Sequence, residues 1–514
     1  MKKYWQNFGI ICSLVLLIAC SDENKDLIPA VKKDFCAGIH RNDSITLSSQ
    51  LKGLEEKMRN KTGVYVLEEG DVSMISRAWL SEYAEKSIDI QYFIFSTDNV
   101  GLIACDYLVR AADRGVKVRI LVDDIMVEAG PHEILAMDAH PNIEIKIYNP
   151  GVNLGKNIFQ KLNAFRKDFS GANQRMHNKI FAVDGKITIT GGRNIADEYF
   201  DYDHEYNFRD RDVLLIGKAT EVVESSFENF WQNAIAVQVS ELVNDSTVKT
   251  NDANRYDRLH QYACNPENFW PQVREKIQGI PQAFKNIQAS GDLLWTDSVV
   301  FVSDVPGKFN ETVKRSGEAL TTGALASLIQ NAKTDVYIQS PYLITNDKIL
   351  NLLKRTVAKG VKMNILSNSL SSTDNLEAFA AYQKCREDIL KAGVRIFEFR
   401  PDAAARYKIM TGVLQKTLSF KPVFGLHAKS MVIDDYITVI GTFNLDPRSA
   451  NLNTECVTII YSKQVAMAVK AHMIEEIKPE NAWETTLQYN PDEKAGTLKR
   501  MKTFTRKVVP KSIL

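Results

Sequence analysis

Two stretches of the sequence share one pattern. The first runs His177-Asn-Lys-Ile-Phe-Ala-Val-Asp184, and Gly191-Gly-Arg-Asn194 follows six residues later. The second runs His427-Ala-Lys-Ser-Met-Val-Ile-Asp434, and Gly441-Thr-Phe-Asn444 follows at the same spacing. Both obey His-x-Lys-x4-Asp-x6-Gly-x-x-Asn, and they begin 250 positions apart, at residues 177 and 427. Chance does not produce two such matches, so we predict an internal duplication.

The spacing within each motif has a physical meaning. Side chains two residues apart in a strand point to the same side, so the histidine and lysine of each motif should project into one site. The aspartate falls at a turn, and the returning strand delivers an asparagine, whose amide can donate hydrogen bonds. Two such units facing each other would surround one point with two histidines, two lysines and two asparagines. The candidate catalytic residues are His177, Lys179, Asp184, His427, Lys429 and Asp434, and the candidate phosphate-binding residues are Asn194 and Asn444.

Strand–helix–strand patterns surround the motifs. Residues 87–94 and 116–122 have the composition of strands, and residues 101–114 between them have helical spacing that ends at a glycine. Residues 334–339 and 361–366 repeat these strands about 245 positions later. We therefore predict an α/β fold of two tandem α/β/α sandwich domains, with mixed, mostly parallel sheets and one active site at their interface.

The boundaries follow from the repeats and from the irregular stretches between them. We assign residues 51–240 to an N-terminal domain, 241–325 to a connecting region, 326–490 to a C-terminal domain and 491–514 to a tail. A polar tether, residues 20–50, precedes the first domain, and residues 1–19 form a signal peptide.

The signal peptide is predicted to be that of a bacterial lipoprotein. Lys2 and Lys3 precede an apolar stretch that is too short for a typical spanning helix and stops at Cys20. This resembles a lipobox, with cleavage before Cys20 and acylation of its thiol; an uncleaved anchor or an ordinary secretory signal is the alternative. We expect a location in the cell envelope, lipid-anchored through Cys20, and Ser21 favours the periplasm-facing outer membrane.

Composition narrows the function classes. The 514 residues include 64 basic and 63 acidic side chains, a formal net charge of +1, which argues against a dedicated nucleic-acid binder. Five cysteines remain after Cys12 and Cys20 are set aside, and they are scattered without a Cys-x-x-Cys pair. Neither a zinc site nor a disulfide framework is indicated; a single bridge is possible, and its partners are left open.

The motif residues suit a phosphodiester. Two lysines and two asparagine amides would stabilise the extra negative charge of the transition state, and one histidine would attack phosphorus while the other protonates the leaving oxygen. No metal or other cofactor is needed. Each histidine requires an acceptor for its second ring nitrogen, and we assign Asp210, 33 residues after His177, and Glu455, 28 residues after His427. Asp212 is an alternative, and so is a surface role for either acid. Asp123-Asp124 is interpreted as a solvated strand end.

The paired motif resembles the phospholipase D superfamily over nearly all of residues 60–480, and its detail is similar to bacterial cardiolipin synthases of the C-type group. Supporting stretches are Gln91-Tyr-Phe93, Asn194-Ile-Ala-Asp-Glu-Tyr-Phe200, Leu426-His-Ala-Lys-Ser430 and Asn444-Leu-Asp-Pro-Arg-Ser449. The resemblance implies phosphatidyl transfer through a phosphohistidine, with His177 as nucleophile and His427 as general acid. It also implies phosphatidylethanolamine or phosphatidylglycerol as donor and phosphatidylglycerol as acceptor. A lipoprotein anchor in place of paired transmembrane helices departs from the common type.

Basic, apolar segments precede each motif. Residues 154–169 and 405–424 combine lysines and arginines with large apolar side chains, which suits an anionic membrane surface or, equally, a helix packed on its own domain. The expected partners are phospholipids and the membrane surface, without nucleic acid; the oligomeric state is left open, with a monomer expected. Competing functions are a phospholipase D releasing phosphatidic acid, a secreted nuclease, and a catalytically silent lipid-binding protein.

Overall fold

The computed structural model describes residues 36, 44–124, 131–151, 174–242, 256–269, 271–308, 320–409 and 422–510. The predicted signal peptide, Cys20, the basic segment 154–169 and most of the basic segment 405–424 lie outside these residues. Within them, no helix combines the length and the hydropathy that crossing a membrane requires.

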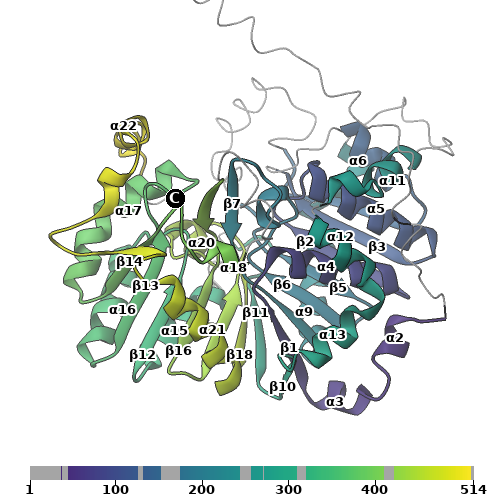
Figure 1. Ribbon diagram of the computed structural model, residues 1–514, viewed down its shortest axis with the longest axis horizontal. Coiled ribbons are helices and arrows are strands. Elements are labelled where there is room, and N and C mark those ends of the chain that lie inside the picture. The colour runs from purple at the N-terminus through teal and green to yellow at the C-terminus, as the bar shows by residue number, and fades with distance from the viewer. Residues whose placement is uncertain are drawn as a thin grey trace, which may run out of the picture.

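The described part of the N-terminal half forms a nine-stranded sheet in the order β10-β1-β8-β6-β5-β2-β3-β4-β9 (Figure 1). Its strands are β1 (Thr62–Leu67), β2 (Ser87–Tyr92), β3 (Lys117–Asp123), β4 (Ile143–Tyr148), β5 (Ile180–Val183), β6 (Ile187–Gly191), β8 (Asp212–Gly217), β9 (Ala236–Gln238) and β10 (Leu294–Thr296).

The described part of the C-terminal half forms an eight-stranded sheet in the order β11-β18-β17-β16-β12-β13-β14-β19. Its strands are β11 (Val299–Ser303), β12 (Asp335–Gln339), β13 (Lys362–Asn368), β14 (Arg395–Phe399), β16 (Ser430–Ile433), β17 (Ile437–Gly441), β18 (Cys456–Tyr461) and β19 (Ala482–Thr485). Apart from the extra β10, each strand takes the place of its sequence equivalent, which confirms the predicted duplication.

The sheets are mixed, as predicted, but they are not mostly parallel. Among the described strands of these two sheets, the parallel pairs are those joined by crossover helices: β2 with β3, β3 with β4, β12 with β13, and β13 with β14. The other pairs within both sheets are antiparallel. The reason is local: each motif is a hairpin, and a hairpin connects antiparallel neighbours.

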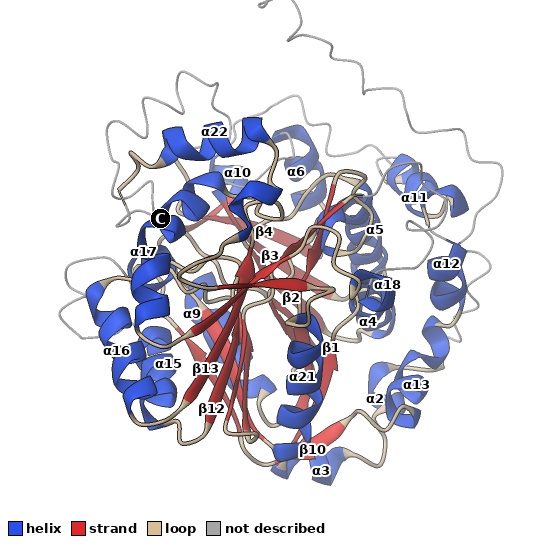
Figure 2. Cartoon of the chain, turned by 60° about the vertical axis from the view of Figure 1, so that its left-hand side comes forward, coloured by secondary structure: helices blue, strands red, loops and turns tan. Residues whose placement is uncertain are grey.

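Helices cover both faces of each sheet (Figure 2). In the N-terminal half, one face packs against α4 (Gly70–Tyr83) and α5 (Asn99–Asp113), and the other against α9 (Thr220–Trp231). The C-terminal half repeats this with α15 (Leu320–Asn331), α16 (Asp347–Ala358) and α17 (Leu376–Lys391) on one face and α21 (Lys463–Glu476) on the other. The α9 and α21 faces share one apolar cluster, which joins the halves.

The segment assigned as a connecting region divides between the two halves. Helices α11 (Asp257–Ala263), α12 (Pro271–Gln278) and α13 (Ala283–Ala289) pack on the N-terminal half, and β10 joins its sheet. Strand β11 already belongs to the second sheet, so the C-terminal half begins near Val299 rather than at 326. The predicted tail also contains ordered structure, including α22 (Thr497–Arg506), which packs against α17.

One disulfide joins Cys36 to Cys264, with the two Cα atoms 5.1 Å apart. It ties the predicted tether to the end of α11, on the N-terminal half. Cys105, Cys385 and Cys456 have free thiols. The bridge that the sequence left open therefore has defined partners.

Candidate active site between the two halves

Each motif histidine lies where a strand of one half pairs with a strand of the other. His427 follows β15 (Val423–Leu426), which pairs in parallel with β7 (Tyr206–Arg209) of the N-terminal half. His177 follows Met176, which forms a parallel bridge with Thr454 of the C-terminal half. The halves thus exchange strands reciprocally, and the registers place His427 beside Asp210 and His177 beside Glu455.

The predicted acids are both at the site, and each serves the histidine of the opposite half. His427 Nδ1 lies 2.6 Å from an Asp210 carboxylate oxygen, and His177 Nδ1 lies 2.8 Å from a Glu455 oxygen. All four side chains are buried. A carboxylate on Nδ1 fixes the tautomer that leaves Nε2 as the reactive nitrogen. The alternative acid Asp212 instead pairs with Arg77 at 3.0 Å.

The two lysines lie beside their histidines in different ways. Lys179 Nζ donates to the carbonyl oxygen of His177 at 2.8 Å and stands 5.6 Å from the centre of the Phe93 ring. Lys429 Nζ also donates to its histidine's carbonyl oxygen, at 2.6 Å, and it lies 2.8 Å from Nδ1 and 2.9 Å from Nε2 of the His427 ring as well. Of the two lysines, Lys429 therefore contacts the ring nitrogens of its histidine, whereas Lys179 contacts the backbone oxygen of His177.

Burial governs the protonation of these groups. It lowers the pKa of His177 to about 4 and that of His427 to about 3, where the Lys429 ammonium adds to the effect. Burial also lowers the pKa of Lys179 to about 7, with help from Lys429, and the pKa of Lys429 to about 8. Burial opposes ionisation of Asp210 and Glu455, but the facing imidazoles and lysines hold both carboxyl pKa values below their usual range. At neutral pH the site contains neutral imidazoles paired with carboxylates.

The chain is similar in sequence to known proteins over most of its length. Residues 80–231 and 325–477 match the family model described as "Cardiolipin synthase, PLD-like domain". Cardiolipin synthase C of Escherichia coli (strain K12) is 31% identical over 447 residues, which cover 86% of this chain and 90% of that protein. An uncharacterized protein of Helicobacter pylori (strain J99) is 33% identical, with 82% and 81% covered.

The chain belongs to the cardiolipin synthase family of phospholipase D-like proteins. A solved structure, phosphatidylserine synthase of Haemophilus influenzae Rd KW20, shares the fold: its TM-score is 0.57 at 13% identity, and the alignment covers 90% of this chain and 100% of that one. The protein is thus a transphosphatidylase of the phospholipase D superfamily, an enzyme of phosphatidyl transfer.

In this transphosphatidylase the segments that precede His177 and His427 are held by two polar side chains. The sequence prediction was wrong for Asp123 and did not include Asn368. Asp123, at the end of β3, is fully buried; it accepts the Met176 N–H at 2.8 Å and pairs with Arg175 at 3.2 Å. Its equivalent Asn368 exchanges hydrogen bonds with Leu426, at 2.7 and 2.8 Å. The interpretation of Asp123-Asp124 as a solvated strand end was wrong, because both side chains are inaccessible to solvent.

The predicted phosphate-binding asparagines are both buried at the carboxyl ends of the returning strands. Asn194 Oδ1 accepts the Ile94 N–H at 3.1 Å, whereas Asn444 Oδ1 has no hydrogen-bond partner among the described residues. The neighbouring glycines allow close packing: a Cβ on Gly192 would lie 2.0 Å from an Asp210 oxygen. A side chain there would displace the acid that holds His427.

The motif aspartates are not at the site. Asp184 and Asp434 have positive φ, 55° and 53°, in the turns that join β5 to β6 and β16 to β17. Each accepts backbone N–H groups that precede the central strand: Asp184 those of residues 85–87, and Asp434 those of residues 333–335. Each aspartate lies five positions after its lysine, with the four residues of the strand between them, a distance of about 16 Å along the strand. The prediction that these aspartates are catalytic is therefore corrected: they stabilise the turns.

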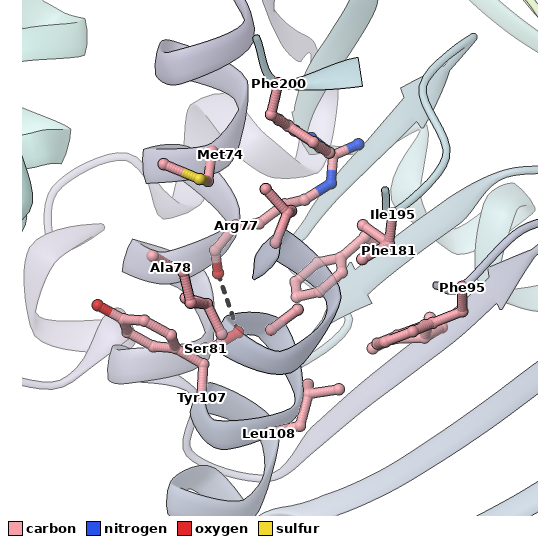
Figure 3. A pocket seen from close by; sticks show the side chains of 14 residues that line it. Met74, Arg77, Ala78, Ser81, Phe95, Tyr107, Leu108, Phe181, Ile195 and Phe200 are labelled. Carbon is pink, nitrogen blue, oxygen red and sulfur yellow. Dashed lines mark hydrogen bonds between the residues drawn. The ribbon is translucent and has the colours of Figure 1, made fainter. Parts of the chain in front are cut away.

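A separate cavity in the N-terminal half belongs to the core rather than to the site (Figure 3). It lies between α4, α5 and the sheet, its volume is about 40 Å³, and its walls are apolar except for Arg77 and Ser81. That volume admits about one water molecule, so the cavity is too small for an acyl chain or a headgroup.

Proposed function

We propose that this transphosphatidylase makes cardiolipin, with phosphatidylglycerol as acceptor and phosphatidylethanolamine or phosphatidylglycerol as donor. The observation that carries the proposal is the pair of carboxylate–histidine contacts, His177–Glu455 and His427–Asp210, assembled beside two buried lysines. The similarity to cardiolipin synthase C over most of both chains supports cardiolipin as the product.

In the first step, Nε2 of His177 attacks the phosphorus of the donor. A neutral imidazole is required, and the lowered pKa of His177 supplies it at neutral pH. The phosphorus–oxygen bond to the headgroup breaks, and the leaving oxygen takes the proton on Nε2 of His427. Glu455 stabilises the positive charge that develops on the His177 ring, while Lys179 and Lys429 offset the charge on the non-bridging oxygens.

The role of Lys429 explains how His427 can be the proton donor although its pKa is lowered. The ammonium against Nε2 opposes a second positive charge on the ring while the site is empty. A bound phosphodiester anion draws the Lys429 charge to itself and favours the imidazolium. Protonation of His427 is thereby linked to substrate binding.

In the second step, a primary hydroxyl of phosphatidylglycerol enters where the headgroup left. His427, now neutral, takes the hydroxyl proton, and the oxygen attacks the phosphorus of the phosphohistidine. The bond between phosphorus and His177 Nε2 breaks, which restores both histidines. Both phosphodiesters persist in the product, so the exchange requires no external energy source or cofactor.

We further propose that the enzyme acts at the bacterial cell envelope, anchored through Cys20 and facing the periplasm. The Cys36–Cys264 disulfide supports this proposal, because disulfides persist in oxidising compartments and are rare in the cytosol. A Cys20→Ala change should release the protein from membranes or block its processing; unchanged attachment would count against lipidation.

The test is to incubate the purified enzyme with labelled phosphatidylethanolamine, with and without phosphatidylglycerol, and to separate the products. Cardiolipin that depends on phosphatidylglycerol is the expected result. Phosphatidic acid in both reactions would instead identify a hydrolase, and the absence of any turnover would overturn the catalytic proposal. The His177→Ala variant is the matched control for contaminating activity.

A further inference from the structure

Helix α22 near the end of the chain is unusually basic. It lies on the upper edge of the C-terminal half, above α17 (Figure 1). Residues 497–510 contain no acidic side chain, and their five cations are Lys499, Arg500, Lys502, Arg506 and Lys507. A segment of this charge favours an anionic partner.

The side of α22 that faces the protein is polar. Lys499 Nζ donates to the backbone oxygens of Ser371 and Thr373, at 3.1 and 2.9 Å. One turn further on, Thr503 is buried, and Arg506 pairs with Glu377 of α17 at 2.9 Å. Hydrogen bonds and an ion pair, rather than apolar packing, therefore hold the helix in place.

The opposite side of α22 is apolar and exposed. Leu498, Met501, Phe504 and Val508 are 65%, 63%, 71% and 85% exposed, the highest values among the large apolar side chains of the described residues. At about 100° per residue Leu498, Met501 and Phe504 fall within a sector of about 120°, and Val508 follows just beyond the end of the helix. An ordinary surface helix buries its apolar side, whereas α22 exposes its apolar side and turns its polar side toward the protein.

The helix is connected to the His427 side of the active site by one loop, residues 369–375. The residue before this loop, Asn368, holds Leu426 next to His427. Within the loop, the Ser372 carbonyl accepts the Tyr206 hydroxyl, and Tyr206 packs on Phe208, whose ring lies 4.7 Å from that of His427. Lys499 binds the carbonyls on either side of Ser372.

We propose that α22 inserts its apolar stripe into the surface of an anionic phospholipid bilayer and so holds the His427 side of the active site next to lipid headgroups. Exposed Arg500 and Lys507 lie on one side of the stripe and exposed Lys502 on the other. Cations that flank an apolar face are the arrangement that binds anionic interfaces. This inference names the surface that delivers substrate and rests on the proposed function.

The experiment compares the predicted mature chain, residues 20–514 carrying Cys20→Ala, in which neither the signal peptide nor an attached lipid contributes, with the same chain carrying L498S and F504S. Vesicles contain phosphatidylcholine with or without phosphatidylserine, and binding is measured by flotation. The wild-type helix should bind the anionic vesicles, and the double change should weaken binding by at least about tenfold. The matched control is V222S with M467S, two apolar side chains of α9 and α21 that are each 53% exposed.

Turnover is measured on the same proteins with a short-chain phosphatidylethanolamine below its micellar concentration. Equal rates for the double variant and the control, together with slower turnover of vesicle lipid by the double variant, support docking through α22. Unchanged vesicle binding would overturn the inference, as would a wild-type dimer that the double change converts to a monomer. If soluble lipid is not turned over at all, the proposed function fails, while the flotation result still decides whether α22 binds the bilayer.

Discussion

The two halves of the active site, one around His177 and one around His427, have the same strand arrangement but different neighbouring side chains. His177 is held by a glutamate that also accepts the Thr442 hydroxyl, and its ring touches Phe93. His427 is held by an aspartate that also accepts the Arg211 N–H, and its ring lies among Tyr199 and Phe208. Only His427 has a lysine against its ring nitrogens.

This difference teaches how a duplicated site can divide one reaction into two roles. In the proposed mechanism the nucleophile needs an Nε2 with no cation against it, and the described contacts of Lys179 Nζ are with the His177 backbone oxygen and the Phe93 ring, not with a ring nitrogen of His177. In the proposed mechanism the proton donor gains its charge only when substrate binds, and Lys429 beside Nε2 of His427 would provide that control. This contrast supports the proposed assignment of His177 as nucleophile without use of the family resemblance.

The largest expected effect comes from removing either histidine. His177→Ala and His427→Ala should each lower turnover of natural phospholipid by at least about 10³-fold. A phosphatidyl ester of p-nitrophenol separates their roles, because its leaving group departs without a proton. In stopped-flow measurements, His427→Ala should still release a burst of nitrophenolate and His177→Ala should release none. The reverse pattern would exchange the two roles.

The next largest effect tests the crossed pairs. Asp210→Asn and Glu455→Gln should each lower turnover by about 10²- to 10⁴-fold, because the imidazole loses its tautomer and its counter-charge. With the nitrophenyl ester, Asp210→Asn should retain the burst and Glu455→Gln should lose it, each following the histidine of the opposite half. Histidine ¹⁵N spectra supply a second measurement: Asp210→Asn should shift the His427 signals and leave those of His177 in place.

The lysines should differ in their pH dependence. Both must carry a proton to bind phosphate, so kcat/KM should fall as the pH rises through the pKa of Lys179, about 7, before that of Lys429, about 8. In Lys179→Arg the guanidinium stays charged, so the alkaline limb should move up toward the pKa of Lys429. Lys429→Arg should leave the limb near its wild-type position. An unchanged limb in both variants would assign it to another group.

The smallest effect is expected at the motif aspartates. Asp184→Ala and Asp434→Ala should each reduce the free energy of unfolding by about 1–3 kcal/mol, because backbone N–H groups lose their acceptor and the turn must keep a positive φ. The value of kcat/KM should stay close to that of the wild type. Calorimetry and the cardiolipin assay on the same preparations check this. A large loss of activity without a loss of thermal stability would return these residues to the catalytic site.

The sequence predicted what repetition and strand alternation determine. The two motifs established the halves, and the i and i+2 spacing placed His177 with Lys179 and His427 with Lys429. It could not predict which acid meets which histidine, because Asp210 and His427 are 217 positions apart and only the strand exchange between the halves brings them together. Spacing within one half suggested the opposite pairing.

Two other differences have equally local causes. The parallel sheets were over-predicted because the crossover units stand out in sequence, whereas the motif hairpins contribute more antiparallel pairs. Asp123 and Asp124 were predicted to be solvated because two charged side chains at a strand end are usually exposed to solvent. Asp123 is instead buried, since Arg175, about 50 residues further along the chain, forms a buried ion pair with it.

The exchange of strands between the halves has a consequence for symmetry. Each half supplies one histidine strand and one acid strand, and each completes the other's pair. Two identical subunits that meet about a twofold axis make the same kind of contact, in which every interaction occurs twice. The chain is, in these terms, a homodimer whose copies have been joined end to end. Joining them made the two copies of each residue separately mutable, and so allowed aspartate on one side and glutamate on the other.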